Sequence, residues 1–149
     1  MDSIDKHIVA ELMQNGRMSN VELADRVGLT PGPCLRRVQR LQAEGVIVGY
    51  SALVDPAAIG REFEVFVNID LTLKDRRSIE AFEERIVEFD EVIEVRRMFG
   101  LPDYFVRVAT ADLESYETFV LTRLTELPGL AKIDSHLTMK TVKSRHQAD

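Results

Sequence analysis

The chain has 149 residues, of which 45% are hydrophobic and 30% charged, and its formal net charge is −6. This composition is typical of one ordinary globular domain or two small ones and excludes a low-complexity chain. No apolar stretch approaches the roughly 20 residues that cross a bilayer, and the first residues have neither region of a signal peptide. The single cysteine, Cys34, excludes an intrachain disulfide, so we expect a cytoplasmic protein without a membrane partner.

The charge is unevenly distributed along the chain. Residues 1–50 carry six basic and six acidic side chains, whereas residues 51–149 carry 13 basic and 19 acidic ones. One stretch of the first part holds four arginines with no acidic residue between them: Arg26, Arg36, Arg37 and Arg40. We therefore expect a local positive field in the first part, and two domains with different partners.

The first two helices are expected within the first 28 residues. Apolar spacing predicts one helix over residues 3–14, which Asn15-Gly16 ends. Ser19 and Glu22 fit a capping box, in which each side chain accepts a hydrogen bond from the backbone of the other residue. The second helix that they open is expected to end at Gly28, because glycine adopts the left-handed conformation that ends helices.

A third helix follows after a very short turn. Thr30 is expected to cap it, and Pro31 fits its first position, where a missing N–H costs nothing. One face of this helix is expected to be apolar through Cys34, Leu35, Val38 and Leu41. The opposite face carries Arg36, Arg37 and Arg40. A short glycine-containing turn between two helices is typical of a helix-turn-helix.

A helix-turn-helix with a basic second helix predicts binding to double-stranded DNA. The third helix would lie in the major groove, where its first turn and its arginines meet base edges and phosphates. The alternative is an amphipathic helix with solvated arginines, and the location of the basic face on the second helix of the motif favours DNA. The candidate DNA-binding residues are Ser19, Asn20, Thr30, Pro31, Gly32, Arg36, Arg37 and Arg40.

The run Val46–Val54 is rich in β-branched residues and ends at Asp55-Pro56. It predicts a strand or short hairpin, either as a wing or as an inter-domain connector. The single Gly49 is weak support for a hairpin and favours the connector. We therefore expect a DNA-binding domain over residues 1–50, a connector or hinge over 51–61, and a second domain over 62–149.

The second half follows a βαββαβ pattern. Alternating apolar residues predict strands at residues 63–71, 92–99, 104–109 and 132–142. Ser78 and Asp112 are expected to cap the two intervening helices. This order is ferredoxin-like, with both helices on one face of an antiparallel sheet, and makes the chain an α+β protein. A partner subunit is expected to cover the other face, which would pair two helix-turn-helices on a two-fold DNA site.

Residues across both halves resemble the leucine-responsive/AsnC (Lrp/AsnC, feast-famine) family of regulators. In the first half these include Val27-Gly28-Leu29-Thr30-Pro31, Pro31-Gly32-Pro33-Cys34-Leu35 and Gly45-Val46-Ile47-Val48-Gly49-Tyr50. In the second half they include Gly100-Leu101-Pro102-Asp103-Tyr104, Pro128-Gly129 and Met139 to Lys143. The resemblance implies an N-terminal winged helix-turn-helix and a C-terminal ACT-like effector domain that forms homodimers, often assembled into octamers.

The resemblance also implies that an amino acid or related small metabolite binds between dimers and alters operator occupancy. The implied contacts are Gly100, Leu101, Pro102, Asp103, Tyr104 and, on the last strand, Ser135. Pro102 lacks the N–H that could hold a carboxylate. Asp103 could accept hydrogen bonds from an ammonium group, or it could be a turn residue only.

Two other classes of function remain as alternatives. An enzyme would have to use Cys34, His7, His136 or His146, but Cys34 falls on an apolar helix face. The sequence shows neither a glycine-rich phosphate loop nor clustered metal ligands, so we expect no enzyme activity, cofactor or metal. The second alternative is a metabolite-sensing module without DNA binding, against which the intact arginine face argues.

Overall fold

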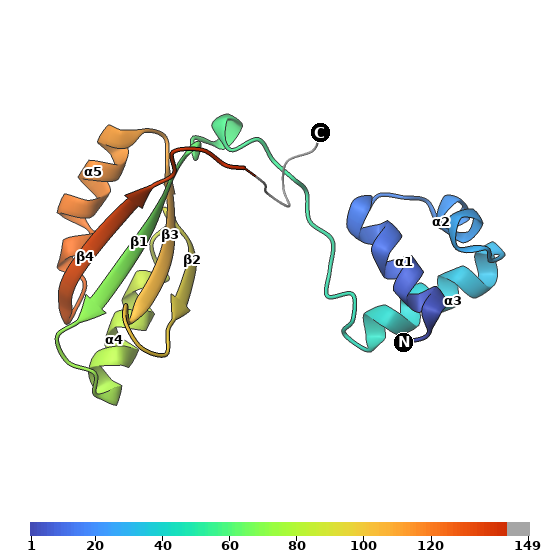
Figure 1. The fold of residues 1–149 in the computed structure, drawn as a ribbon, viewed down its shortest axis with the longest axis horizontal. Coiled ribbons are helices and arrows are strands. Elements are labelled where there is room, and N and C mark those ends of the chain that lie inside the picture. Colours follow the sequence, from blue (N-terminus) through green and yellow to red (C-terminus); the bar gives the residue numbers. More distant parts are fainter. Residues whose placement is uncertain (143–149) are drawn as a thin grey trace. The chain divides into compact units, whose positions relative to one another are not determined.

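The computed structural model describes residues 1–142, so Lys143 and His146 lie outside the described part of the chain. The chain divides into two compact units, with the boundary after Leu53. Three helices form the N-terminal unit (Figure 1), namely α1 (Ser3–Gln14), α2 (Asn20–Val27) and α3 (Pro31–Ala43). These bounds confirm the three predicted helices.

The helix ends show which predicted caps form. The Ser19 hydroxyl accepts from the Glu22 N–H at 3.2 Å, but the return bond is missing because the Glu22 carboxylate instead pairs with Arg26. Gly28 ends α2 with a φ of 69°, as predicted. Thr30 occupies the N-cap position of α3 and Pro31 its first helical position, as predicted, but the Thr30 side chain makes no capping hydrogen bond. The reason is that Pro33 occupies the third helical position and has no N–H to offer.

The core of the N-terminal unit forms where the three helices meet. Its fully or nearly fully buried side chains are Ile8, Leu23, Ala24, Val27, Cys34 and Leu41. Leu35 was expected among them but is 45% exposed. It follows Cys34 by one residue, and a 100° step turns it away from the line through Cys34 and Leu41.

The predicted strand over Val46–Val54 is wrong. Between α3 and residue 63 the structure contains only a short 3-10 helix, η1 (Ala57–Ile59). Val48 is 94% exposed, and no strand among residues 1–142 pairs with this segment. Tyr50 packs on the turn after α1: a Cβ added to Gly16 would lie 3.2 Å from Tyr50 Cδ1. The Tyr50 hydroxyl also accepts from Gln42 Nε2 at 3.4 Å, so the segment is anchored up to Tyr50.

The C-terminal unit is a four-stranded antiparallel sheet with two helices on one face (Figure 1). The sheet order is β2-β3-β1-β4. Its elements in chain order are β1 (Phe63–Leu71), α4 (Arg76–Ile86), β2 (Val92–Arg97), β3 (Tyr104–Thr110), α5 (Leu113–Thr122), the 3-10 helix η2 (Leu124–Glu126) and β4 (Leu130–Leu137). This order confirms the predicted ferredoxin-like arrangement and the α+β class.

Two local predictions in this unit need correction. Asp75, rather than Ser78, caps α4, because its carboxylate accepts from the Ser78 N–H at 3.1 Å and from the Ser78 hydroxyl at 2.7 Å. The last strand begins at Leu130 and ends at Leu137, where its pairing with Val65 of β1 is complete. The Asp112 cap of α5 forms as predicted, with 2.7 Å between its carboxylate and the Ser115 N–H.

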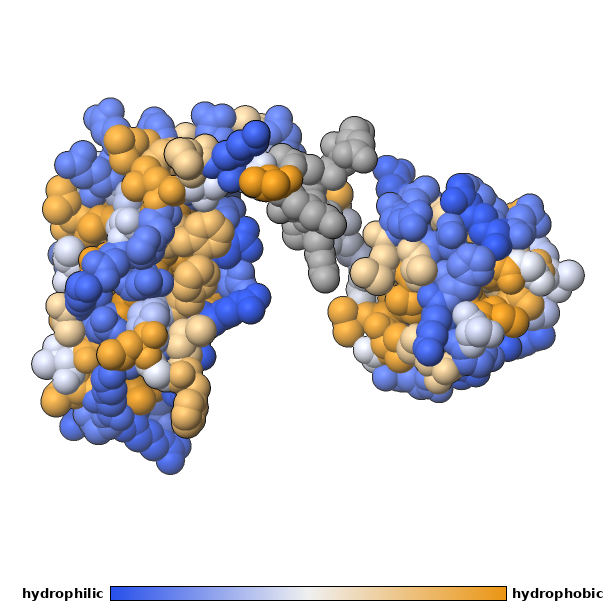
Figure 2. Space-filling model, in the orientation of Figure 1, coloured by the Kyte–Doolittle hydropathy of each residue, from blue (hydrophilic) through white to orange (hydrophobic). Residues whose placement is uncertain are grey.

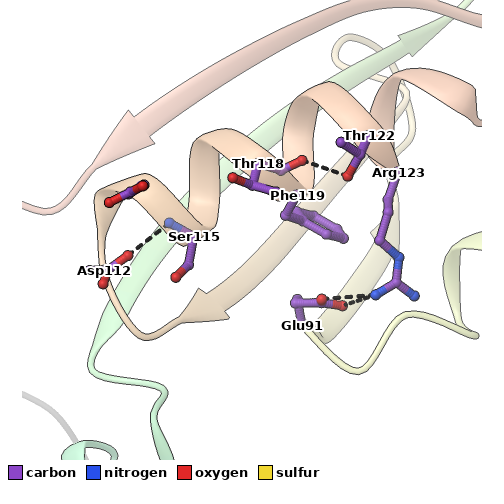
Figure 3. A pocket seen from close by; sticks show the side chains of 8 residues that line it. Glu91, Asp112, Ser115, Thr118, Phe119, Thr122 and Arg123 are labelled. Atoms are coloured by element: carbon purple, nitrogen blue, oxygen red, sulfur yellow. Dashed lines mark hydrogen bonds and ion pairs between the residues drawn. The ribbon is translucent and has the colours of Figure 1, made fainter.

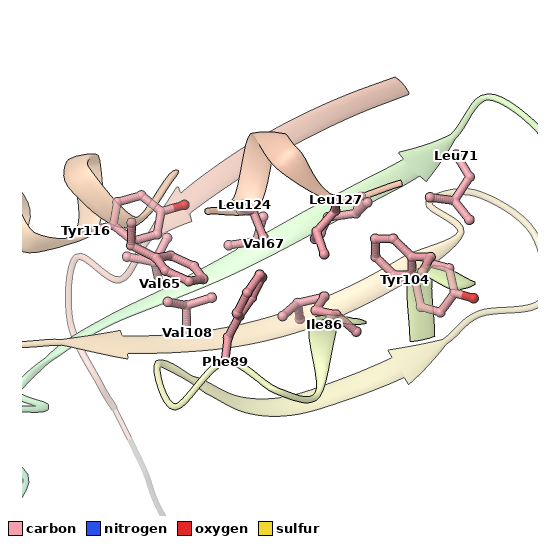
Figure 4. Packing of buried hydrophobic residues seen from close by; sticks show 14 residues of the cluster. Val65, Val67, Leu71, Ile86, Phe89, Tyr104, Val108, Tyr116, Leu124 and Leu127 are labelled. Carbon is pink, nitrogen blue, oxygen red and sulfur yellow. The ribbon is translucent and has the colours of Figure 1, made fainter. Parts of the chain in front are cut away.

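The core of the C-terminal unit lies between the sheet and its two helices (Figure 4). Val65, Val67 and Ile69 project from β1 toward the helices and are fully buried. Phe82 of α4 and Phe119 of α5 complete the same cluster. Burial of each such side chain contributes about 1.5–3 kcal/mol, so this layer holds the sheet rigid and fixes the loops at its ends.

Candidate nucleic-acid interface and effector site

The start of α3 is held against the start of α2. The Asn20 side chain donates from Nδ2 to the Pro31 carbonyl oxygen at 2.8 Å. The Ser19 hydroxyl is used as the cap of α2, and Thr30, Pro31 and Gly32 are exposed. The structure therefore brings the predicted DNA-binding residues of the two helices together. Asn20 also has an internal role that sequence patterns did not indicate, because it fixes the two helix ends relative to each other.

Three arginines and Pro33 line a shallow, open pocket of about 360 Å³ on α3. The arginines are the predicted Arg36, Arg37 and Arg40. A concave surface with several guanidinium groups is suited to a phosphate, which guanidinium binds through two parallel hydrogen bonds. The predicted basic face of the third helix thus exists as one continuous site.

The positive field of this site is smaller than the sequence window indicated. Arg37 Nη1 donates to Asp2 Oδ2 at 2.7 Å and to Asp5 Oδ1 at 2.8 Å. Arg40 Nη2 donates to Asp5 Oδ2 at 2.6 Å. Arg26 in turn contacts carboxylates of α1 and α2. Acidic residues distant in sequence therefore neutralise part of the charge, so the expected local positive field is reduced.

The pKa of the Asp5 carboxyl is lowered from the ordinary 3.8 to about 2. The largest cause is the hydrogen bond from the Asp2 N–H, which burial opposes and the two arginines reinforce. The pKa of the Arg37 guanidinium is raised by its hydrogen bonds to Asp2 and Asp5. The network is therefore fully ionised at neutral pH. Asp2 and Asp5 were missed as site residues, although their spacing at the start of a helix is that of a capping box.

The predicted effector loop follows β2 and includes Gly100, whose φ of 117° requires a glycine-like conformation. Leu101 is 78% exposed. The Asp103 carboxylate accepts from the Leu71 N–H at 2.9 Å and pairs with Lys74 Nζ at 2.6 Å. Burial opposes ionisation of Asp103, but these two donors outweigh it and leave its pKa below 3.8.

Tyr104 lies inward from this loop rather than in it. Its ring packs 4.6 Å from that of Phe82, and its hydroxyl donates to Glu83 Oε1 at 2.8 Å. Burial, followed by Glu83, raises the pKa of the Tyr104 hydroxyl. Tyr104 and Asp103 nevertheless line a cavity of about 120 Å³, together with Leu71, Lys74, Ile79, Arg97 and Met98. Lys74 and Arg97 were not predicted, and no local motif marks them.

Ser135 is not among the residues that line this cavity. It faces the helices, where its hydroxyl lies 2.6 Å from the Tyr116 hydroxyl. Ser135 of β4 lies opposite Val67 of β1, whereas Tyr104 of β3 lies opposite Ile69 of β1. Within one chain the structure therefore does not bring Ser135 to the predicted effector loop.

A larger groove of about 340 Å³ runs beside α5 (Figure 3). Arg123 crosses it and contacts both Glu91 carboxylate oxygens at 2.8 and 3.0 Å. Its guanidinium also lies 4.6 Å from the centre of the Phe89 ring. Arg123 and Glu91 thus pair with each other across this groove, at the end of α5.

The sheet face opposite the helices mixes aromatic and charged side chains. Phe66 and Phe105 lie 5.6 Å apart there, and Arg107 lies 5.8 Å from the centre of the Phe66 ring. Arg107 also contacts Glu64 and Glu94. Figure 2 shows apolar residues interspersed with hydrophilic ones on the visible side of this unit. The face is therefore less apolar than the strand pattern indicated, but its centre carries two aromatic rings.

Three of the four side chains considered for catalysis, Cys34, His7 and His136, lie among the described residues. Cys34 is fully buried, and burial raises the pKa of its thiol. His7 lies 3.6 Å from Glu11, and His136 lies 3.2 Å from Asn68 Nδ2. Among residues 1–142, histidine, cysteine and acidic side chains form no group suited to a metal ion. Within the same range no helix is long and apolar enough to cross a membrane.

Comparison with known proteins identifies both halves of the chain. A winged helix-turn-helix DNA-binding domain matches residues 1–48, and the Lrp/AsnC ligand binding domain matches residues 64–148. The chain belongs to the Lrp/AsnC family. It is 36% identical to the leucine-responsive regulatory protein of Escherichia coli K12 over 147 residues, which cover 99% of this chain and 90% of that protein. The sequence-based resemblance is therefore confirmed.

Solved structures of other regulators agree with this family. An AsnC family transcriptional regulator of Agrobacterium tumefaciens has 31% identity and a TM-score of 0.90, covering 100% of this chain and 97% of its own. A transcriptional regulator of Neisseria meningitidis, solved as its L-Met complex, has 30% identity and a TM-score of 0.91, covering 97% and 93%. This Lrp/AsnC chain is thus a DNA-binding transcription regulator with a ligand-binding domain.

Proposed function

We propose that this Lrp/AsnC regulator binds operators as a dimer or higher oligomer and that an amino acid or related metabolite controls this binding. The observation that carries the DNA part is the pocket of Arg36, Arg37 and Arg40 on α3, next to the exposed start of that helix. In this arrangement Thr30, Pro31 and Gly32 approach base edges while the arginines meet phosphates and bases. Ser19 and Asn20 adjoin the same side at the start of α2.

The open sheet face supports the dimer. A helix-turn-helix contacts one half-site, and a two-fold dimer contacts two. Phe66 and Phe105 provide an aromatic centre, and the ion-paired Arg107 provides a polar margin, as protein–protein interfaces do. A second copy is the occupant proposed for this face, with octamers as the further assembly.

The loop beside Asp103 supports an amino acid effector. The Asp103 carboxylate pairs with the ammonium group of Lys74, which supports the proposal that it binds the ammonium group of an effector. Arg97, which lines the adjoining cavity, supplies positive charge for a carboxylate. The neisserial regulator was solved with L-Met, an amino acid of the same class. Backbone and side chains of Gly100 to Tyr104 would contact the effector, and Ser135 would contribute only from another subunit.

Two measurements on the full-length protein test this proposal. Binding to promoter-sized duplexes at increasing salt should weaken steeply, with a logarithmic slope of about −0.9 for each phosphate contacted. A DNA affinity that does not change with salt would instead favour a metabolite-sensing module without DNA binding. A thermal-shift screen of the twenty amino acids and their oxo acids should raise the melting temperature for one chemical class. Absence of any shift would contradict the effector part alone.

A further inference from the structure

The N-terminus of α1 is in direct contact with the arginines of α3. Asp2 and Asp5 form a reciprocal capping box, with 2.8 Å between the Asp5 N–H and Asp2 Oδ1 and 2.9 Å between the Asp2 N–H and Asp5 Oδ2. The same two carboxylates accept from Arg37 and Arg40. One hydrogen-bonded network therefore joins the first turn of α1 to the arginine-bearing face of α3, the proposed recognition helix.

The two carboxylates differ in environment. The Asp5 side chain is 2% exposed and contacts both arginines, whereas the Asp2 side chain is 52% exposed and contacts Arg37 alone. A buried carboxylate with two guanidinium partners fixes their positions, since its own position is fixed by packing and by the capping bond. An exposed carboxylate with one partner is screened by water and contributes mainly its charge.

Charge and geometry predict opposite effects of Asp5 on DNA binding. A negative charge beside the phosphate-binding face should weaken binding to every duplex. Fixed guanidinium groups, however, lose less conformational freedom on binding than free ones and present their donors at defined positions. Arg36 has no ion-pair partner among residues 1–142 and lines the same pocket, so it stays free to follow the DNA backbone.

We propose that Asp5 is a positioning residue for sequence recognition: it holds Arg37 and Arg40 in the orientation in which α3 meets its operator. This inference rests on the proposed use of α3 in DNA binding. Asp2 acts on the same arginines mainly as a charge. The consequence is that loss of the Asp5 carboxylate lowers discrimination between operator and other DNA, although it makes the N-terminal unit more positive.

The test compares two probes bound by the full-length protein. One is the duplex that the wild-type protein enriches from a random-sequence library, and the other is a scrambled duplex of the same composition. Asp5→Asn should weaken binding to the enriched duplex by about fivefold to tenfold, while binding to the scrambled duplex is kept or strengthened. The ratio of the two affinities therefore falls, which loss of fold alone would not produce.

Three variants make this result decisive. Asp25→Asn removes one charge from an exposed position of α2 that pairs with neither Arg37 nor Arg40, and should strengthen binding to both probes by the same factor. Asp2→Asn keeps a residue that can cap α1, and should also strengthen binding to both probes by the same factor. Asp5→Glu keeps the charge but displaces the carboxylate, so the ratio of affinities for the enriched and scrambled duplexes should fall. This variant tests the positioning role if Asp5→Asn does not fold.

Two outcomes separate the possible failures. If the ratio is unchanged in Asp5→Glu and in folded Asp5→Asn, Asp5 is not a positioning residue, although α3 still contacts DNA. If the wild-type protein enriches no sequence and its binding does not depend on salt, the proposed DNA-binding role of α3 fails as well.

Discussion

Lys74 and Asp103 form an ion pair with 2.6 Å between Nζ and Oδ1. The lysine is half-exposed, whereas the aspartate is largely buried and also accepts from the Leu71 N–H. The carboxylate proposed to bind the effector ammonium is thus occupied by an ammonium group of its own chain. An amino acid that enters this loop has to displace Lys74.

Removal of this competitor should strengthen effector binding. We expect Lys74→Met to bind the amino acid found in the thermal-shift screen about threefold to fivefold more tightly, since an ion pair with a half-exposed lysine contributes about 1 kcal/mol. Isothermal titration calorimetry measures the change. Lys132→Met, which removes a comparable ion pair with Asp134 on β4, should leave the affinity unchanged.

Asp103→Asn provides the complementary control, because an amide oxygen can keep the bond from the Leu71 N–H while the charge is lost. Binding of the amino acid should be abolished with little change in melting temperature. Equal affinities in Lys74→Met and the wild-type protein would show that Lys74 does not occupy the effector position.

How far the sequence could predict these sites depends on how far apart along the chain the interacting residues are. Ser19, Gly28 and Asp112 were correctly placed because a cap involves residues within one helical turn. The pairing of Arg37 with Asp5 spans 32 positions, and only the packing of α1 on α3 brings them together. No periodicity records such a contact, so the charge of the recognition helix was overestimated.

The two caps that differ from the prediction have local physical reasons. Thr30 has the right residue type, but Pro33 removes the donor that it would have capped. Ser78 competes with Asp75, and the carboxylate is the stronger acceptor for the free N–H groups of α4. The strand predicted at residues 46–54 failed because a β-branched run forms a strand only where another strand is available.

Arg36 should account for a full phosphate contact. Because it is free of ion pairs in residues 1–142, Arg36→Gln removes a charge that is available to DNA. We expect weaker binding to enriched and scrambled duplexes alike, and a salt slope reduced by about one. Fluorescence anisotropy at several salt concentrations measures both. Arg77→Gln, at an exposed position of α4, is the control. An equal loss of DNA affinity in this variant would contradict a specific role for Arg36.

The aromatic centre of the open sheet face should be essential for dimers. Phe66→Glu introduces a charge beside Phe105, in a position that a second copy would bury. We expect the dimer to weaken by at least about 30-fold, since a central aromatic anchor contributes about 2 kcal/mol or more. Sedimentation velocity would then show monomers at micromolar concentration. Val87→Glu, at the exposed end of α4, should remain dimeric; monomers in both variants would point to general instability instead.

The stability of the N-terminal unit should depend on Asp5 at acidic pH. Its pKa lies at about 2 in the folded chain against 3.8 ordinarily, so its stabilising effect is complete above about pH 4 and is lost as the pH falls through 2. Labelling of buried Cys34, the single cysteine, by 4,4′-dithiodipyridine reports opening of this unit. Between pH 4 and 2 the labelling rate should rise more steeply in the wild-type protein than in Asp5→Asn. The same dependence of the labelling rate on pH in both proteins would contradict the lowered pKa of Asp5.

The contact between Tyr50 and Gly16 sets the length of the tether between the two units. The chain is anchored up to Tyr50, residues 51–60 are exposed, and η1 makes only local backbone hydrogen bonds before β1 begins at Phe63. Residues 51–62 reach about 40 Å at most when fully extended. A tether of this length limits how far apart the two half-sites of an operator can be. Additional residues after Tyr50 should broaden the half-site spacings that one dimer accepts while the affinity for a single half-site stays the same.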